Sequence, residues 1–367
     1  MTISRAKLHE YFPPDYESSR AQFIERCQRH GGIHLSAPIE ATTPSGEPLS
    51  LDIARFGPQD APRVLALSSG THGVEGFLGA AIQSATVELK LQELLSYEGT
   101  ALLLIHAVNP FGFAHLRRVN EDNVDLNRNF LLDQERYEGA AQGYRALDPF
   151  LNPPSPPSPL ELFKLKALLK IARYGLPALK ASVAQGQYEH PKGLFFGGHE
   201  ASASKRVIDE GLRGWLEGAE RVIHIDLHTG LGPWGSYVLA SSAGLPKPQL
   251  EWLMAHFDPA RVQRLEEEGL LYQIRGEFTE RCRELCGAVE YYPVLAEFGT
   301  YPILRVLSAL RAENRATHHC APDDPRLSAA RLALREAFAP QSEAWRAETL
   351  RQGLEIVSQA TRALAQP

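Results

Sequence analysis

Residues 64–76 read VLALSSGTHGVEG, and this stretch decides the fold. The apolar run Val64–Leu67 predicts a buried β-strand, and the glycines that follow it predict a tight turn. His72 and Glu75 lie in that turn, three residues apart. Because open α/β sheets bind ligands at the carboxyl ends of their strands, a histidine and a carboxylate at this place indicate the start of a metal site.

The composition is that of a globular protein, with 44% hydrophobic and 22% charged residues in a chain of 367. A net charge of −6 and a pI near 6.1 predict no nucleic-acid and no membrane partner. The chain begins without the apolar core of a signal peptide and has no apolar run of membrane-spanning length, so we expect a cytoplasmic location. The four cysteines agree with that compartment, and Cys282 and Cys286 are expected to pack on one helix face. The sequence does not predict the oligomeric state.

Strands alternate with long helices along the chain, which predicts an α/β fold. A Pro-rich stretch at 148–159 is followed at once by a helical segment, so we interpret it as part of an insertion at about 131–199 and not as a domain linker. We therefore expect one domain over residues 1–367. The elements expected are helices at 17–30, 76–95, 160–183, 204–217 and within 327–364, paired strands within 37–56, and strands at 64–68, 101–108, 221–228 and 292–299.

A second histidine completes the ligand set at the end of another predicted strand. His228 ends the run 221–228 and is followed by a Gly-rich turn. Two histidines and one carboxylate that leave a position open for water are typical of a catalytic zinc site, so His72, Glu75 and His228 are predicted to hold one Zn²⁺ per chain. His224 shares a strand face with His228 and is expected to have a packing or supporting role. An alternative takes His224, Asp226 and His228 as the ligands of a different metal hydrolase.

Between the two histidine segments, residues 109–130 read NPFGFAHLRRVNEDNVDLNRNF. Amide hydrolysis needs a cation near the developing oxyanion, and recognition of a carboxylate favours an Arg fork aided by an amide. Arg118 and the pair Asn127–Arg128 offer both kinds of group. Asp125 is predicted to accept a hydrogen bond from the outer ring nitrogen of His72.

These motifs, in this order over residues 60 to 300, resemble the zinc carboxypeptidase superfamily. The resemblance implies a three-layer α/β/α fold around a mixed sheet of eight strands, with the zinc on the three ligands named above. It also implies that Arg118 polarises the scissile carbonyl, with Arg117 as a close rival, and that Asn127 and Arg128 bind a terminal carboxylate. Glu297, in the run LAEFGT, matches the general base of the family. The partly buried position expected for it would raise its pKa, which suits a proton acceptor.

The substrate stays open between two classes. The phrases HGVEG around Glu75 and DLHT around His228 resemble the aspartoacylase and succinylglutamate desuccinylase branch equally well. A peptidase acting on short peptides is the leading hypothesis, an N-acyl amino acid deacylase the second, and a catalytically inactive binding module the third. Three tyrosines, Tyr272, Tyr291 and Tyr292, are candidates for a substrate clamp.

The predicted insertion has two further features. The stretch GLFFGG at 193–198 is similar to that of a bacterial subgroup of the superfamily known as an uncharacterised domain. Because the insertion lies between catalytic strands, we expect it to cover the cleft and restrict it to small substrates.

Overall fold

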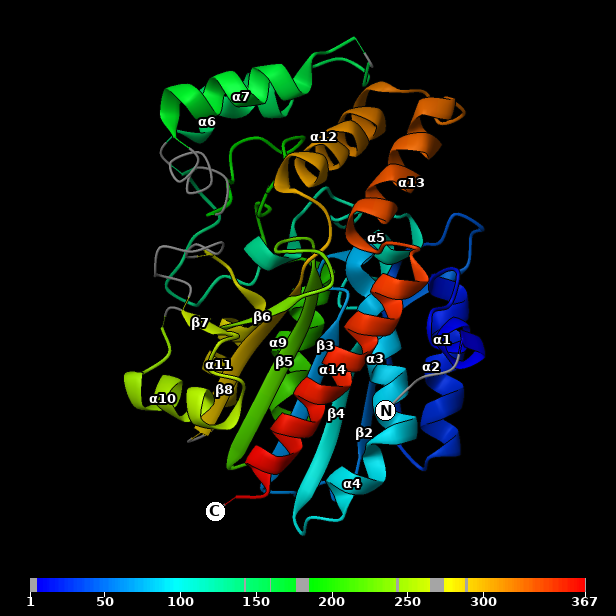
Figure 1. Ribbon diagram of the computed structural model, residues 1–367, viewed down its shortest axis with the longest axis vertical. Helices are drawn as coiled ribbons and strands as arrows, with labels where there is room; N and C mark the ends of the chain where they lie inside the picture. The colour runs from blue at the N-terminus through cyan, green and yellow to red at the C-terminus, as the bar shows by residue number, and fades with distance from the viewer. Residues whose placement is uncertain are drawn as a thin grey trace.

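A computed structural model describes residues 5–141, 143–158, 160–175, 185–241, 244–264, 274–287 and 290–366. Within these residues, eight strands form one sheet in the order β1-β2-β4-β3-β5-β8-β6-β7 (Figure 1). The strands are β1 (Ile33–Thr42), β2 (Pro48–Phe56), β3 (Arg63–Ser69), β4 (Thr100–His106), β5 (Arg221–Thr229), β6 (Tyr237–Ser241), β7 (Val262–Arg264) and β8 (Glu290–Phe298).

The sheet is mixed, as the resemblance implied. Its centre, β4-β3-β5-β8, is parallel, whereas β1, β2 and β6 each join a neighbour in the antiparallel direction. After β3 the chain crosses to β4 on one side, and β5 lies on the other side of β3. The carboxyl ends of β3 and β5 therefore form a topological switch point, where doubly wound sheets bind their ligands.

Helices cover both faces of the sheet, which confirms the three-layer α/β/α architecture. Alternate residues of β3 divide between the two layers: Leu65 and Leu67 join one core, and Val64 and Ala66 join the other. The first layer contains α1 (Arg5–Tyr11), α2 (Tyr16–Arg29), α3 (Gly76–Leu89), α4 (Leu91–Leu95), α10 (Lys247–His256) and α14 (Glu343–Leu364). The second contains α9 (Ala203–Trp215) and α11 (Phe278–Cys286).

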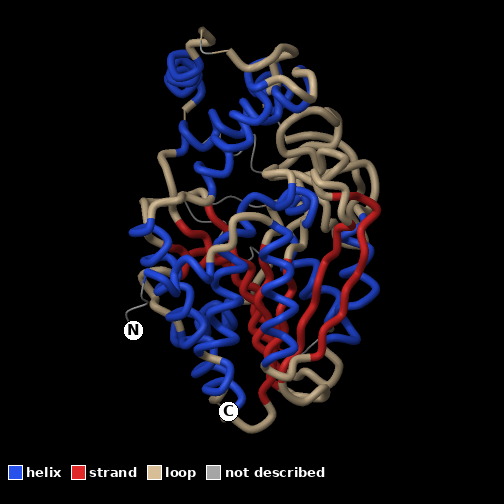
Figure 2. Tube along the Cα trace, turned by 90° about the vertical axis from the view of Figure 1, so that its right-hand side faces the viewer, coloured by secondary structure: helices blue, strands red, loops and turns tan. Residues whose placement is uncertain are grey.

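A third group of helices lies beyond the carboxyl ends of the central strands, at the upper end of the molecule in Figure 1. The side view in Figure 2 shows the strands ending below this group. Its members are α5 (Pro110–Ala114), α6 (Tyr144–Leu151), α7 (Phe163–Tyr174), α12 (Ile303–His319) and α13 (Pro325–Phe338).

The expected elements are present, but several have different bounds; β1, for example, begins at Ile33, before the expected range of 37–56. The helix expected at 76–95 divides into α3 and α4 at Lys90, and the helical C-terminal region divides into α13 and α14 around Pro340. The segment expected to be helical over 160–183 is a helix from Phe163 to Tyr174, and residues 176–184 lie outside the described ranges. No helix in the described part of the chain has the length and apolarity needed to cross a bilayer.

Candidate metal centre

The turn after β3 is built to fit against a neighbouring loop. It continues as the short 3-10 helix η1 (Gly73–Glu75). A Cβ atom at Gly73 would lie 2.1 Å from the backbone of Gly112, so only glycine allows this approach. The Val74 N–H donates to the carbonyl of Arg117 at 2.9 Å, and the Gly73 N–H donates to that of Arg118 at 3.2 Å. The ligand turn and the Arg117–Arg118 segment are therefore held together through their backbones.

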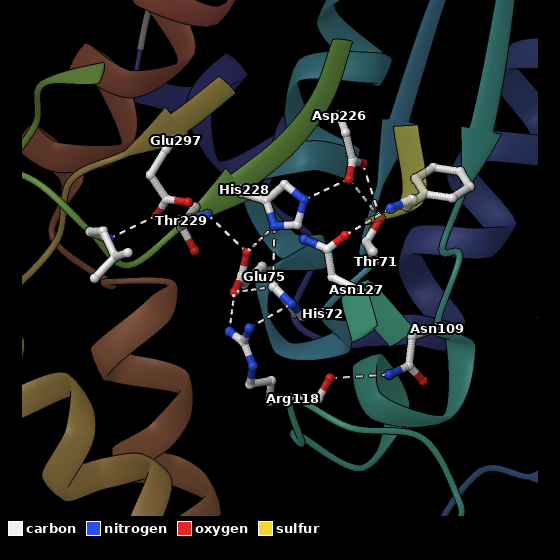
Figure 3. A network of polar contacts seen from close by, with 12 residues as sticks. Thr71, His72, Glu75, Asn109, Arg118, Asn127, Asp226, His228, Thr229 and Glu297 are labelled. Atoms are coloured by element: carbon white, nitrogen blue, oxygen red, sulfur yellow. Dashed lines mark hydrogen bonds and ion pairs between the residues drawn. The ribbon is translucent and has the colours of Figure 1, made fainter. Parts of the chain in front are cut away.

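The side chains of His72, Glu75 and His228 converge at the switch point (Figure 3). Nδ1 of His72 lies 2.9 Å from Oε1 of Glu75, and Nδ1 of His228 lies 3.1 Å from both Nδ1 of His72 and Oε2 of Glu75. Ligand atoms around a tetrahedral zinc ion are roughly 3.3 Å apart. All three residues are buried, and within the described ranges they are the group that could hold a metal ion.

A buried carboxylate lies next to the outer nitrogen of each histidine. Nε2 of His228 lies 2.5 Å from Oδ2 of Asp226, and Nε2 of His72 lies 3.2 Å from Oδ1 of Asp125. The Asp226 carboxylate favours the His228 tautomer that carries its proton on Nε2, which leaves Nδ1 of His228 available to a metal ion. Nε2 of His72 also lies 2.6 Å from Nη2 of Arg118, which can only donate. The donor set therefore fits a metal in its chemistry as well as in its spacing.

The electrostatics of the group also favour a bound cation. Burial opposes ionisation of Glu75, but His72 and His228 hold the pKa of this carboxyl well below its usual value. Burial likewise disfavours a charge on His228, but Asp226 and Glu75 raise the pKa of its imidazole well above the usual value. The carboxylates thus make this buried place attractive to positive charge.

The two neighbouring arginines point to different partners. Arg118 lies at the metal group, with Nη2 2.6 Å from Nε2 of His72, Nη1 3.4 Å from Oε1 of Glu75, and Nε donating to Oδ2 of Asp125 at 3.0 Å. Arg117 instead forms a buried ion pair with Glu313 of α12, in which Nε and Oε1 are 2.7 Å apart. Of the two, only Arg118 contacts the ligand side chains.

Asn127 lies beside His228 in the same close view (Figure 3). Its Oδ1 accepts a hydrogen bond from the backbone N–H of Phe278 at 3.0 Å. Because the oxygen is engaged, the amide is left with the Nδ2 donor for another partner. Arg128 is buried beside it, and its Nε has no hydrogen-bond partner among the described residues. Asn127 and Arg128 thus both present hydrogen-bond donors, which suit an anionic partner.

Glu297 is brought to the group by the pairing of β5 with β8. His228 and Glu297 are directly opposite each other in this parallel register. The Leu231 N–H donates to Oε1 of Glu297 at 2.7 Å, which leaves Oε2 without this contact. Burial, with a contribution from the charge of Glu75, raises the pKa of Glu297 to about 8.

The alternative ligand set does not assemble around His224. Nε2 of His224 lies 2.8 Å from the Ser68 hydroxyl and Nδ1 lies 2.7 Å from the Tyr291 hydroxyl, so both ring nitrogens have partners. Tyr291 and Tyr292 lie at the start of β8, at the opposite end of the strand from Glu297. Tyr272 lies outside the described residues.

The sequence did not predict the hydrogen bonds that support Asp226 and Asn127. Ser68 and Thr71 donate hydroxyl hydrogen bonds to Asp226, at 2.6 and 3.0 Å, and so orient the carboxylate that holds His228. The alternation of β5 places Asp226 and His228 on one face and could have indicated this role. The contact between Phe278 and Asn127 joins residues 151 positions apart and has no local sequence signal.

Residues 191–198 lie against the loop that carries Arg118. The Asp125 N–H donates to the carbonyl of Phe196 at 2.7 Å, and Nδ2 of Asn123 donates to the carbonyl of Pro191 at 2.9 Å. The ring of Phe195 lies 5.8 Å from the guanidinium carbon of Arg118, and its backbone has the uncommon φ of +60°. The second half of the 131–199 region is therefore next to the metal group.

The family described as "Protein of unknown function (DUF2817)" matches residues 12–352. No curated protein sequence matches the chain. Among solved structures, the chain is similar to carboxypeptidase A from Helicoverpa armigera, with 15% identity, a TM-score of 0.46, and 96% of this chain and 73% of that one covered.

Two more solved structures are similar. Thrombin activatable fibrinolysis inhibitor has 14% identity and a TM-score of 0.48, with 90% of this chain and 79% of that one covered. A provisionally assigned metallopeptidase from Shewanella amazonensis SB2B has 15% identity and a TM-score of 0.46, with 89% of this chain and 94% of that one covered. At these identities and TM-scores, neither activity nor substrate follows from the likeness.

Proposed function

We propose that this chain, which belongs to the DUF2817 family, is a zinc hydrolase that cleaves an amide bond next to a free carboxylate. The observation that carries the proposal is the convergence of His72, Glu75 and His228 on one buried point. We propose short peptides as the substrates, in the manner of a metallocarboxypeptidase, and a cytoplasmic location.

His72, Glu75 and His228 would hold the metal, and Asp125 and Asp226 would orient the two histidines. A zinc ion in such a site supplies a Lewis acid that polarises a carbonyl oxygen and lowers the pKa of water. The remaining chemistry is assigned to side chains around this group.

Glu297 is proposed as the residue that moves the proton. A carboxyl whose pKa is raised to about 8 can take up and release a proton near neutral pH. Since Oε1 accepts from the Leu231 N–H, Oε2 is the atom proposed to accept the proton of the attacking water. The same oxygen would then deliver the proton to the leaving amine.

Arg118 is proposed to stabilise the oxyanion that develops on the scissile carbonyl, because its guanidinium contacts the ligand side chains. Arg117 is engaged by Glu313 and is not assigned this role. Asn127 and Arg128 are proposed to bind the substrate carboxylate, since both present donors.

We further propose that the chain forms one domain and that its 131–199 segment restricts access to the site. The contacts of Phe195 and Phe196 with the Arg118–Asp125 loop support this arrangement. Short substrates would pass such a cover, and long polypeptides would not.

A hydrolysis screen tests the proposal. Metal-depleted and zinc-restored protein would be assayed on dipeptides, tripeptides, and N-acetyl and N-succinyl amino acids. Zinc-dependent release of a C-terminal residue from short peptides is the expected result. Preferential turnover of the acyl amino acids would identify a deacylase instead. If the protein binds zinc but hydrolyses neither class of substrate, it is a catalytically inactive binding module. Cleavage of long polypeptides would contradict the proposal that the 131–199 segment restricts access to the site.

A further inference from the structure

Helix α7 contacts the rest of the protein through one narrow side. Of its residues, only Phe163 and Ala167 are buried. The ring of Phe163 stacks on Phe150 of α6 with 5.5 Å between centroids, and the Arg311 guanidinium of α12 lies 4.6 Å from the Phe163 ring. These contacts determine which side of α7 faces inward.

The opposite side of α7 carries an apolar stripe. Leu165, Leu168 and Leu169 are 53%, 55% and 62% exposed, and Leu162, just before the helix, is 66% exposed. At 3.6 residues per turn, Leu165 lies roughly 180° around the helix from the midpoint of Phe163 and Ala167. Contiguous exposed apolar patches that are rimmed by polar residues mark interaction surfaces.

Basic side chains border the leucine stripe on both sides. By helical spacing Lys164 lies along one edge, and Lys166 and Arg173 lie along the other. Lys170 lies further inward, with its ammonium 5.4 Å from the centre of the Phe150 ring. No acidic residue occurs from residue 162 to 175. This helix is therefore cationic in a chain whose net charge is −6.

We propose that α7 is an interfacial helix that docks the protein on an anionic lipid surface. Its leucines would enter the boundary between headgroups and acyl chains, and its basic side chains would contact lipid phosphates. Pairing of α7 with α7 of a second copy is disfavoured because it would bring two basic surfaces together. The inference departs from the expectation of no membrane partner, which rested on charge averaged over the whole chain.

The position of α7 determines which end of the protein would face the lipid surface. The helix lies beyond the carboxyl ends of the central strands (Figure 1). The metal group lies at the carboxyl ends of two of these strands, β3 and β5. A lipid surface bound by α7 would therefore face this end of the protein. The inference does not depend on the proposed hydrolysis, because it rests on the exposure and charge of α7 alone.

Vesicle flotation with the full chain tests the proposal. Binding to vesicles of phosphatidylglycerol mixed with phosphatidylcholine is expected to exceed binding to pure phosphatidylcholine at least about tenfold, and to weaken in high salt. The double variants Leu165→Ser/Leu169→Ser and Lys166→Glu/Arg173→Glu are each expected to reduce binding at least about tenfold. All four side chains are exposed, so both variants should keep the wild-type melting temperature.

The control variants make the same kinds of substitution at exposed residues of other helices. Leu332→Ser removes a leucine of α13 that is 55% exposed, and Lys247→Glu reverses an exposed charge on α10. Both are expected to bind like the wild type. The proposal is overturned if the wild type does not float with anionic vesicles, or if the α7 variants bind as the wild type does. It is also overturned if the leucine variant converts a dimer to a monomer without lipid, because a second copy would then cover the stripe.

Discussion

Oδ2 of Asp226 lies 2.5 Å from Nε2 of His228, two residues further along β5. Both side chains are buried, and the carboxylate also accepts hydrogen bonds from Ser68 and Thr71. The orientation of His228 as a proposed ligand therefore depends on Asp226, which contacts Nε2 of the ring while Nδ1 faces the metal group.

Replacing this carboxylate should weaken metal binding without removing a ligand. We expect Asp226→Asn to lower zinc affinity about 10- to 100-fold, because an amide holds the imidazole less firmly and makes it less basic. Competition with a chromogenic chelator would measure the change. Asp52→Asn is the matched control, since Asp52 is a buried carboxylate that contacts another histidine, His34, at 2.8 Å. Equal zinc affinities in the wild type and in Asp226→Asn would show that Asp226 does not support His228 as a metal ligand.

The ligand assignment itself predicts the metal content. Purified wild type should contain about one zinc ion per chain, and His72→Ala should contain far less, since structural and catalytic sites use three or four protein ligands. Elemental analysis by mass spectrometry gives the ratio directly. His30→Ala, at an exposed histidine after α2, should retain the wild-type content. Zinc retained by His72→Ala would place the metal elsewhere.

Arg117→Gln and Arg118→Gln should differ in their effect on catalysis. Arg118→Gln is expected to reduce kcat about 10²- to 10³-fold, as is typical when an oxyanion donor is lost, and also to lower the unfolding free energy, because it removes the ion pair with the buried Asp125. Arg117→Gln is expected to cost about 3–5 kcal/mol of unfolding free energy, because it leaves Glu313 buried without its cation. Urea unfolding and steady-state kinetics on both variants separate the two roles. A reversed pattern would favour Arg117 as the catalytic arginine.

Asn127→Asp tests the carboxylate site and retains the fold of the loop. The new side chain can still accept from the Phe278 N–H, but it offers a negative charge where the amide offered a donor. Because like charges in contact cost several kcal/mol, KM for a substrate with a free carboxylate should rise by at least about tenfold. The matching substrate with a C-terminal carboxamide should show no such rise. Equal effects on both substrates would show that Asn127 does not meet the carboxylate.

Glu277 predicts a pH dependence of stability. This buried residue caps α11 by accepting from the N–H groups of Thr279 and Glu280, at 2.9 and 3.0 Å. Burial raises its pKa to about 7 from 4.5, so between these pH values the folded state holds a proton that the unfolded chain has released. The contribution of Glu277 to the free energy of unfolding therefore falls as the pH rises from about 4.5 to about 7. The total decrease is up to about 3 kcal/mol, and the contribution is constant at higher pH.

The comparison with Glu277→Gln isolates that contribution. The difference in unfolding free energy between the wild type and the variant should move in favour of the variant from pH 5 to pH 8. Urea titrations at several pH values measure it, with Glu47→Gln at an exposed turn as the control. A difference that is independent of pH would show that Glu277 titrates normally.

The sequence predicted the elements of the central sheet because their signals are local. The runs 64–68 and 101–108 are almost continuously apolar, as expected of strands covered on both faces. The strand β6 and the edge strand β7 were missed because they have only five and three residues. The choice between Arg117 and Arg118 also lay beyond the sequence. It depends on Glu313, which is 196 residues away from Arg117 and whose position is determined by the packing of α12.

The pairing of β5 with β8 has a consequence for heat inactivation. His228 and Glu297 are neighbours in a ladder of backbone hydrogen bonds at the centre of the sheet, and neither residue is carried by a loop. Their spacing can change only if that ladder opens, and central strands open together with the whole molecule. The distance between His228 and the proposed proton acceptor should therefore persist on warming until the protein melts as a unit.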